Sequence, residues 1–166
     1  MSATSGGVNA SCFAIELAGE TLELHPNRSM WWAKEKTLLI SDVHLGKSAH
    51  FRKHGIAIPK EVNASSLARL EILIRTYSPE RVLVLGDLFH SDLNAEWAEF
   101  RHWLIRVYAT YSLQEFRLVE GNHDILPDDA FDGINVTRSV QWSSGPFDFV
   151  HDPRDFRTQA APGRIG

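Results

Sequence analysis

The sequence is poor in cysteine, in long apolar runs and in positive charge. Its single cysteine, Cys12, excludes an internal disulfide and fits a reducing compartment. No apolar run approaches the roughly 20 residues that a membrane-spanning helix needs. Residues 1–10 are small and polar, without the basic region and apolar stretch of a secretory signal. We therefore expect a cytoplasmic protein with no membrane partner, in which Cys12 is a small buried side chain.

The net charge is -4, which argues against bulk attraction to nucleic acid but is compatible with a local basic patch. The 166 residues are 43% hydrophobic and 23% charged, the range of a soluble globular protein with a real core. We find no internal repeat. We expect a flexible tail over residues 1–10 and one domain over residues 11–166.

The middle of the chain alternates between buried strands and amphipathic helices. Apolar runs without alternation predict strands buried on both faces over residues 37–41, 81–85 and 115–120. Apolar residues at helical spacing predict helices over residues 63–77 and 95–111. This order of elements predicts a parallel sheet with right-handed crossovers.

Both ends of the domain are rich in strand-like segments. Near the N-terminus, residues 13–17 and 21–25 flank a predicted hairpin turn at Gly19-Glu20. Further short strands are expected over residues 29–32 and around residues 134–136, 140–142 and 147–150. We expect these terminal segments to form a second sheet packed on the first.

Each of the three central strands runs into side chains that bind metals. Asp42 and His44 follow the first strand, Asp87 follows the second, and the segment Gly121–Asp124 (GNHD) follows the third. In an open α/β sheet, ligands bind at this carboxyl edge. The alternative for any one of these residues, such as His44, is an ordinary polar loop position. Three such segments in order along the chain, each directly after a buried strand, favour a metal site over ordinary loops.

The candidate metal ligands form a mixed oxygen and nitrogen set: Asp42, His44, Asp87, Asn122 and His151. Such a set suits two divalent ions, with Mn²⁺ expected first and Fe²⁺ or Zn²⁺ as alternatives. Two cations about 3.5–4 Å apart share a hydroxide and hold both ends of an in-line displacement at phosphorus. The alternative for His151 is a histidine at a strand end that is bonded to backbone.

The candidate catalytic residues are His123 and Asp124. A leaving alkoxide needs a proton, and the His123 imidazole is placed beside the ligand Asn122 to supply it. Asp124 is expected to hold that imidazole in one tautomer. The alternative is that His123 is purely structural.

Three further residues are candidates for substrate binding: Lys47, Arg52 and His90. The first two lie in a basic segment directly after His44, where they would meet phosphate at the rim of the site. The alternative is a solvated helix face. His90 follows Asp87 closely, but it is equally consistent with an ordinary helix N-terminus.

These motifs resemble the first three signature blocks of the calcineurin-like metallophosphoesterases: Asp42-Val43-His44, Gly86-Asp87 and Gly121–Asp124. The chain looks most like the bacterial DNA-ligase-associated subgroup. That likeness depends on Leu24-His25-Pro26 with Trp31-Trp32, Ser41–Lys47, Phe51-Arg52, Leu85–Ser91 and Gly145–Phe147 before His151.

The resemblance implies a two-sheet α/β sandwich flanked by helices (αββα) and metal-dependent hydrolysis of a phosphate ester, more specifically a diester. It implies that Asp42, His44 and Asp87 bind one metal, that Asp87 bridges, that Asn122 and His151 bind the second metal, and that His123 is the acid. It also implies nucleic-acid ends or nucleotides as substrates. The implied protein partners are DNA repair enzymes such as a ligase, a helicase or a nuclease.

The family's final motif, G-H-x-H, is absent from the sequence, which ends at Gly166. That motif supplies one more histidine to each metal. We therefore expect a domain that is incomplete at its C-terminal end, weak metal binding and low turnover. Three alternatives stay open: a nucleotide-lipid pyrophosphatase, a cyclic-nucleotide phosphodiesterase, and an inactive binding module of the same fold.

Overall fold

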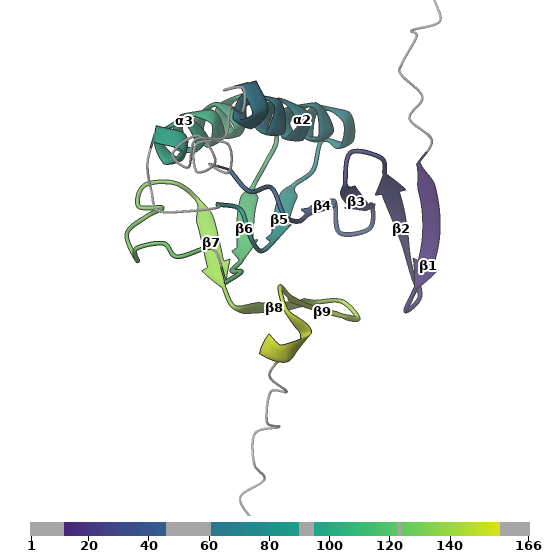
Figure 1. The fold of residues 1–166 in the computed structure, drawn as a ribbon. Coiled ribbons are helices and arrows are strands. Elements are labelled where there is room, and N and C mark those ends of the chain that lie inside the picture. Colours follow the sequence, from purple (N-terminus) through teal and green to yellow (C-terminus); the bar gives the residue numbers. More distant parts are fainter. Residues whose placement is uncertain (1–11, 46–60, 90–94, 123, 157–166) are drawn as a thin grey trace, which may run out of the picture.

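The computed structural model describes residues 12–45, 61–89, 95–122 and 124–156. A seven-stranded sheet forms the centre, with two helices on one face and a two-stranded hairpin on the other (Figure 1). The strands of the central sheet are β1 (Phe13–Leu17), β2 (Glu20–His25), β3 (Ser29–Trp32), β4 (Thr37–Ile40), β5 (Arg81–Leu85), β6 (Glu115–Val119) and β7 (Val136–Ser139). The remaining elements are α2 (Glu61–Tyr77), α3 (Ala95–Thr110), β8 (Gln141–Ser144), β9 (Phe147–Val150) and the short 3-10 helix η1 (Pro153–Asp155).

The N-terminal strands and β7 belong to the central sheet, so our expectation that the terminal segments form a second sheet is wrong for them and holds only for β8 and β9. Strand order follows the chain from β1 to β7, and β1 to β4 pair antiparallel. The first hairpin turns at Ala18 and Gly19, whose φ angles are 52° and 81°. Two left-handed residues give the tight turn that matches strand twist, so β2 folds directly back onto β1.

The parallel part of the sheet brings three strand ends to one edge. β4, β5, β6 and β7 pair in parallel, with Ile40 beside Val84 and Leu85 beside Val119. Helices α2 and α3 make the crossovers, as the sequence predicts. Because the strands end in step, the segments that follow them emerge side by side.

The larger part of the core lies between this sheet and the helices. The two helices bury one stripe each against the sheet: Leu67, Leu70, Leu73 and Ile74 from α2, and Phe100, Trp103, Leu104 and Val107 from α3. The facing sheet residues are Leu38, Ile40, Val82, Val84, Phe116 and Leu118. This face of the parallel strands is closed to water, which leaves their carboxyl ends as the place where polar groups gather.

The hairpin β8–β9 covers part of the opposite face. Its aromatic side chains Trp142, Phe147 and Phe149 pack against a second cluster that contains the fully buried Trp32. The Arg81 and Arg117 guanidinium carbons each lie 5.0 Å from the centre of the Trp142 ring. These cation–π contacts fix the hairpin on the sheet and thereby position His151, the residue after β9.

The structure also bears on the expectations for Cys12, for membrane-spanning helices and for the N-terminal tail. Cys12, expected to be buried, is exposed, because β1 is the edge strand of the sheet. In the described part of the chain, no helix is long and apolar enough to cross a membrane. The expected tail over residues 1–10 lies outside the described residues.

Stability should depend strongly on the buried stripe of α3. We predict that Phe100→Ala lowers the free energy of unfolding by about 3–5 kcal/mol, because it empties a fully buried site. The matched control is Ile105→Ala on the same helix, which is 48% exposed and should cost about 0.5 kcal/mol. Urea unfolding followed by tryptophan fluorescence measures both. Equal losses would contradict the assignment of this stripe to the core.

Candidate metal centre

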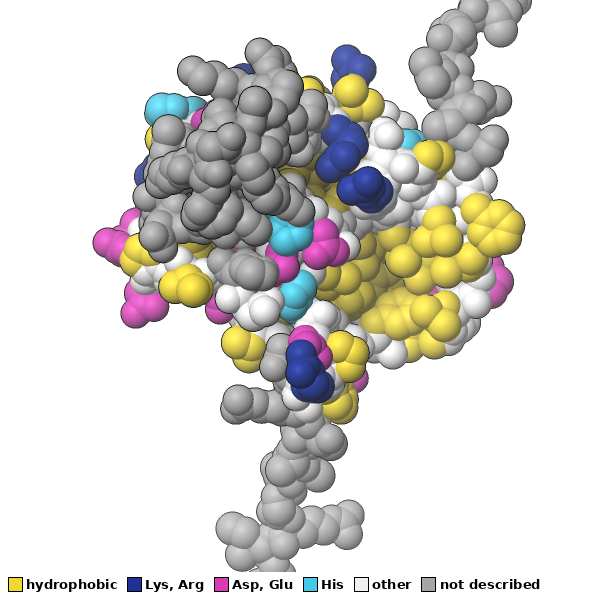
Figure 2. Space-filling model, in the orientation of Figure 1, with side chains coloured by type: hydrophobic (Ala, Val, Ile, Leu, Met, Phe, Trp, Pro, Cys, Tyr) yellow, Lys and Arg dark blue, Asp and Glu magenta, His cyan; other side chains and the backbone are white. Residues whose placement is uncertain are grey.

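The segments that follow β4 and β5 run alongside each other and bring three predicted ligands together. The His44 amide donates to the Asp87 carbonyl at 2.9 Å, and the Leu45 amide donates to the Leu88 carbonyl at 2.8 Å. One ligand atom from each of Asp42, His44 and Asp87 lies within 4.8 Å of the others. His44 Nε2 is 3.6 Å from Asp42 Oδ1. A space-filling view shows histidine and acidic side chains gathered on this face (Figure 2).

The backbone at these ligands is left-handed. Asp42, His44 and Asp87 have φ angles of 51°, 50° and 54°, and Gly86 has a φ angle of 73°. Non-glycine residues avoid this region, at a cost of about 1–3 kcal/mol each. Such strain persists only where surrounding contacts impose it, and it clusters at functional sites. The paired segments therefore hold the ligand side chains at the sheet edge against local preference.

The Asp124 carboxylate joins the turn after β6 to the segment after β5. Its Oδ2 accepts from the Asp87 amide at 2.8 Å and from the Gly121 amide at 2.9 Å, and its Oδ1 accepts from the Phe89 amide at 3.1 Å. Burial raises the pKa of Asp124, the three amide donors act in the opposite direction, and the nearby Asp87 carboxylate raises it further. Asp124 thus positions Asp87 through backbone contacts that the sequence did not predict.

His151 reaches the same centre from the hairpin. Its Nδ1 lies 3.1 Å from the Leu85 carbonyl oxygen. A carbonyl only accepts, so Nδ1 carries the proton and Nε2 presents its lone pair. Nε2 lies 3.6 Å from Asp87 Oδ1. The two sequence-based alternatives for His151 are therefore compatible: one nitrogen contacts the backbone, and the role of the other as a metal ligand stays a prediction.

Two glycines make room for this arrangement. A Cβ at Gly86 would overlap the His151 ring, and a Cβ at Gly121 would overlap the Asp87 carboxylate and lie 2.7 Å from the Asp87 amide nitrogen. The glycine of the Gly-Asp pair and that of GNHD therefore have a steric role. In the sequence, the only indication of this steric role is that each glycine directly precedes a candidate ligand.

The donor set fits divalent metal ions. Oxygen and nitrogen ligands about 2.0–2.2 Å from an ion lie up to about 4.4 Å from one another. The observed separations of 3.6 Å fall in this range. Asp87 is close both to the Asp42–His44 pair and to His151 Nε2. Carboxylates with imidazoles suit Mn²⁺, Fe²⁺ and Zn²⁺.

The other predicted site residues are distributed as follows. Asn122 follows Gly121 at the same turn, and its side chain is exposed. Four residues lie outside the described part: the candidate acid His123 and the candidate substrate-binding residues Lys47, Arg52 and His90. The expected contact between Asp124 and His123 stays a prediction.

A family model described as calcineurin-like phosphoesterase matches residues 35–160. The chain belongs to this family. Among solved structures, this phosphoesterase is similar to a nuclease MPE from Pseudomonas putida, with 27% identity and a TM-score of 0.71. The match covers 86% of this chain and 67% of the nuclease chain. No curated protein matches significantly. The predicted metallophosphoesterase fold is thereby confirmed.

Filling the space beside Asp87 should disrupt metal binding by the phosphoesterase. We predict that Gly121→Ala raises the dissociation constant for Mn²⁺ at least about 10-fold, because the new methyl group displaces the Asp87 carboxylate. Isothermal titration calorimetry measures this.

The control for this substitution is Gly19→Ala, at a turn where a Cβ meets nothing within 4 Å. Its φ of 81° makes alanine cost about 1–2 kcal/mol of stability, while Mn²⁺ affinity should stay unchanged. An unaltered Mn²⁺ affinity in Gly121→Ala would contradict the steric role of this glycine.

Proposed function

We propose that this phosphoesterase hydrolyses phosphodiesters with two divalent ions, Mn²⁺ first, and that its substrates are nucleic-acid ends or nucleotides. The observation that carries this proposal is the convergence of Asp42, His44 and Asp87 from two strand ends, with His151 Nε2 directed at Asp87 from the other side. A structural or capping role for these residues would not require four strained or crowded positions at one place.

Each residue has a defined task in the proposal. Asp42 and His44 would hold the first ion, Asn122 and His151 would hold the second, and Asp87 would be a ligand of both. The ions, when bound, lower the pKa of water and offset the negative charge of the phosphate. The Leu85 carbonyl keeps His151 in the tautomer that presents Nε2. The Asp124 carboxylate accepts from the amides of Asp87 and Phe89 and thereby fixes the backbone that carries the Asp87 side chain.

His123 donates the proton to the leaving alkoxide. A diester with a poor leaving group needs that proton, because an alkoxide is a strong base. In the sequence, His123 stands between Asn122 and Asp124, and Asp124 accepts from the Gly121 amide. The turn after β6 adjoins Asp87, where the phosphate would bind.

The substrate class has its own support. The similar solved structure carries the name of a nuclease, and the subgroup that the sequence resembles is DNA-ligase-associated. We therefore propose a role beside DNA repair enzymes such as a ligase, a helicase or a nuclease. The net charge of -4 favours short or single-stranded ends over tight duplex binding.

Removal of the bridging carboxylate should abolish turnover. With Mn²⁺ added, we expect hydrolysis of bis-p-nitrophenyl phosphate. Asp87→Ala should reduce the rate to that of the uncatalysed reaction, measured as released nitrophenolate. Asp132→Ala, which removes an exposed carboxylate elsewhere, should keep the full rate. Normal turnover by the Asp87 variant would refute the bridging role.

The proton donor is tested by the choice of leaving group. We predict that His123→Ala lowers kcat about 10²–10⁴-fold on a dinucleotide, whose leaving alkoxide must be protonated, and far less on bis-p-nitrophenyl phosphate. Mn²⁺ affinity, measured by calorimetry, should stay near that of the parent. Equal losses on the two substrates would argue against the acid assignment.

A further inference from the structure

We propose that Arg28 and Arg69 bind a phosphate group of the substrate strand next to the one that is cleaved. This inference depends on the proposed function, since it assigns the neighbouring part of the same substrate. It makes the preferred substrate a nucleic-acid strand with several phosphates rather than a lone nucleotide diester.

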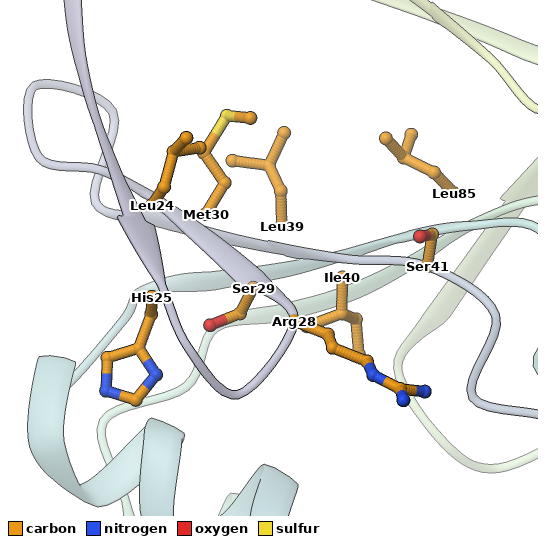
Figure 3. A pocket seen from close by; sticks show the side chains of 9 residues that line it. All are labelled: Leu24, His25, Arg28, Ser29, Met30, Leu39, Ile40, Ser41 and Leu85. Carbon is orange, nitrogen blue, oxygen red and sulfur yellow. The ribbon is translucent and has the colours of Figure 1, made fainter. Parts of the chain in front are cut away.

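The two arginines share a hollow that adjoins the metal ligands. Arg28 lies in the turn between β2 and β3, and Arg69 lies on α2, yet both line one hollow together with Ser41 and Val43. Ser41 and Val43 flank the candidate ligand Asp42 in the chain. In Figure 3, the Arg28 side chain extends past Ile40 toward the Ser41 end of β4. The hollow itself has room for about one water molecule, with a volume of about 20 Å³, so a phosphate would bind at its mouth, beside the scissile group.

The Arg28 and Arg69 guanidinium groups are available to bind an anion. In the described part of the chain, the side chains of Arg28 and Arg69 have no ion pair or hydrogen bond to another residue. Other arginines are engaged by carboxylates: Arg81, Arg106, Arg117, Arg138 and Arg154. These two guanidinium groups, which have no carboxylate partners there, make this hollow locally positive on a protein whose net charge is negative.

The chemistry of the pair fits phosphate. A guanidinium group offers parallel N–H donors that match two oxygens of a phosphate, and it stays charged at every physiological pH. Arg28 holds a left-handed backbone, with a φ of 58°, that turns β2 into β3. Arg69 is half-buried on a helix. Both therefore project from fixed elements, which lowers the entropy cost of binding an anion.

There is also space for the rest of a strand. Arg28, Ile40 and Ser41 form a shared wall between this hollow and a larger one of about 370 Å³. Leu24, Met30, Leu39 and Leu85 point into the larger hollow (Figure 3). In Figure 2, this apolar area borders the acidic and histidine side chains of the metal centre. A strand thus has a path from the metal centre past the arginines.

Binding without catalysis tests the proposal first. The probe is a fluorescein-labelled single-stranded DNA 12-mer in EDTA, followed by anisotropy. The Arg28→Ala/Arg69→Ala variant should raise the dissociation constant at least about 10-fold. It should also reduce the slope of log K against log salt by about 1.4, which is about 0.7 for each lost phosphate contact.

A matched control comes from the same helix. Arg75 is exposed on α2 and lines a different hollow, with Ile72 and Tyr111. Arg75→Ala removes the same charge as Arg69→Ala and should change the dissociation constant less than about 2-fold. An equal effect of the two single variants would overturn the proposal, because it would indicate bulk charge. Unchanged binding in the double variant would also overturn it.

Activity then separates this inference from the proposed function. Bis-p-nitrophenyl phosphate has no neighbouring phosphate, so the double variant should hydrolyse it at the parental rate, while KM for the 12-mer rises about 10-fold. Equal losses on both substrates would refute a neighbouring-phosphate site. If the parent hydrolyses neither substrate, the proposed function fails, and the anisotropy comparison still decides whether the arginines bind a strand.

Discussion

One buried carboxylate holds the candidate site together. Asp124 accepts from the backbone amides of Asp87, Phe89 and Gly121, so it ties the turn after β6 to the segment after β5. The segment after β5 in turn pairs with the segment after β4 through Leu45. Three strand ends are thus joined in series. A buried acceptor of three amides is costly to remove, because each donor would be left without a partner.

The two faces of the sheet contribute to the site in different ways. On the helix side, the buried core holds β4, β5 and β6 in place, because residues of all three strands pack against α2 and α3. The other face supplies His151, which follows the hairpin that Trp142 holds on the sheet through its contacts with Arg81 and Arg117. The geometry of the candidate metal site therefore depends on how the hairpin is positioned relative to the central sheet. Small shifts of the hairpin would move His151 Nε2 relative to the Asp87 carboxylate.

The sequence predicted the central elements well, because buried strands and their ends follow local apolar patterns. The strands Ser29–Trp32 and Arg81–Leu85 occur as expected, and so does the placing of Asp87 at a strand end. The partner sheet of the N-terminal strands was not predictable from local pattern, since alternation does not say which edge a hairpin joins. Arg28 and Arg69 were missed for a similar reason: they belong to no motif, and only the packing of α2 beside the β2–β3 turn brings them together.

The left-handed backbone at Asp42, His44 and Asp87 sets folding stability against the candidate site. Glycine at any of these positions would relax the backbone, but it would remove a carboxylate or imidazole group from the sheet edge. At these three positions a more stable chain is therefore a chain with fewer candidate ligands.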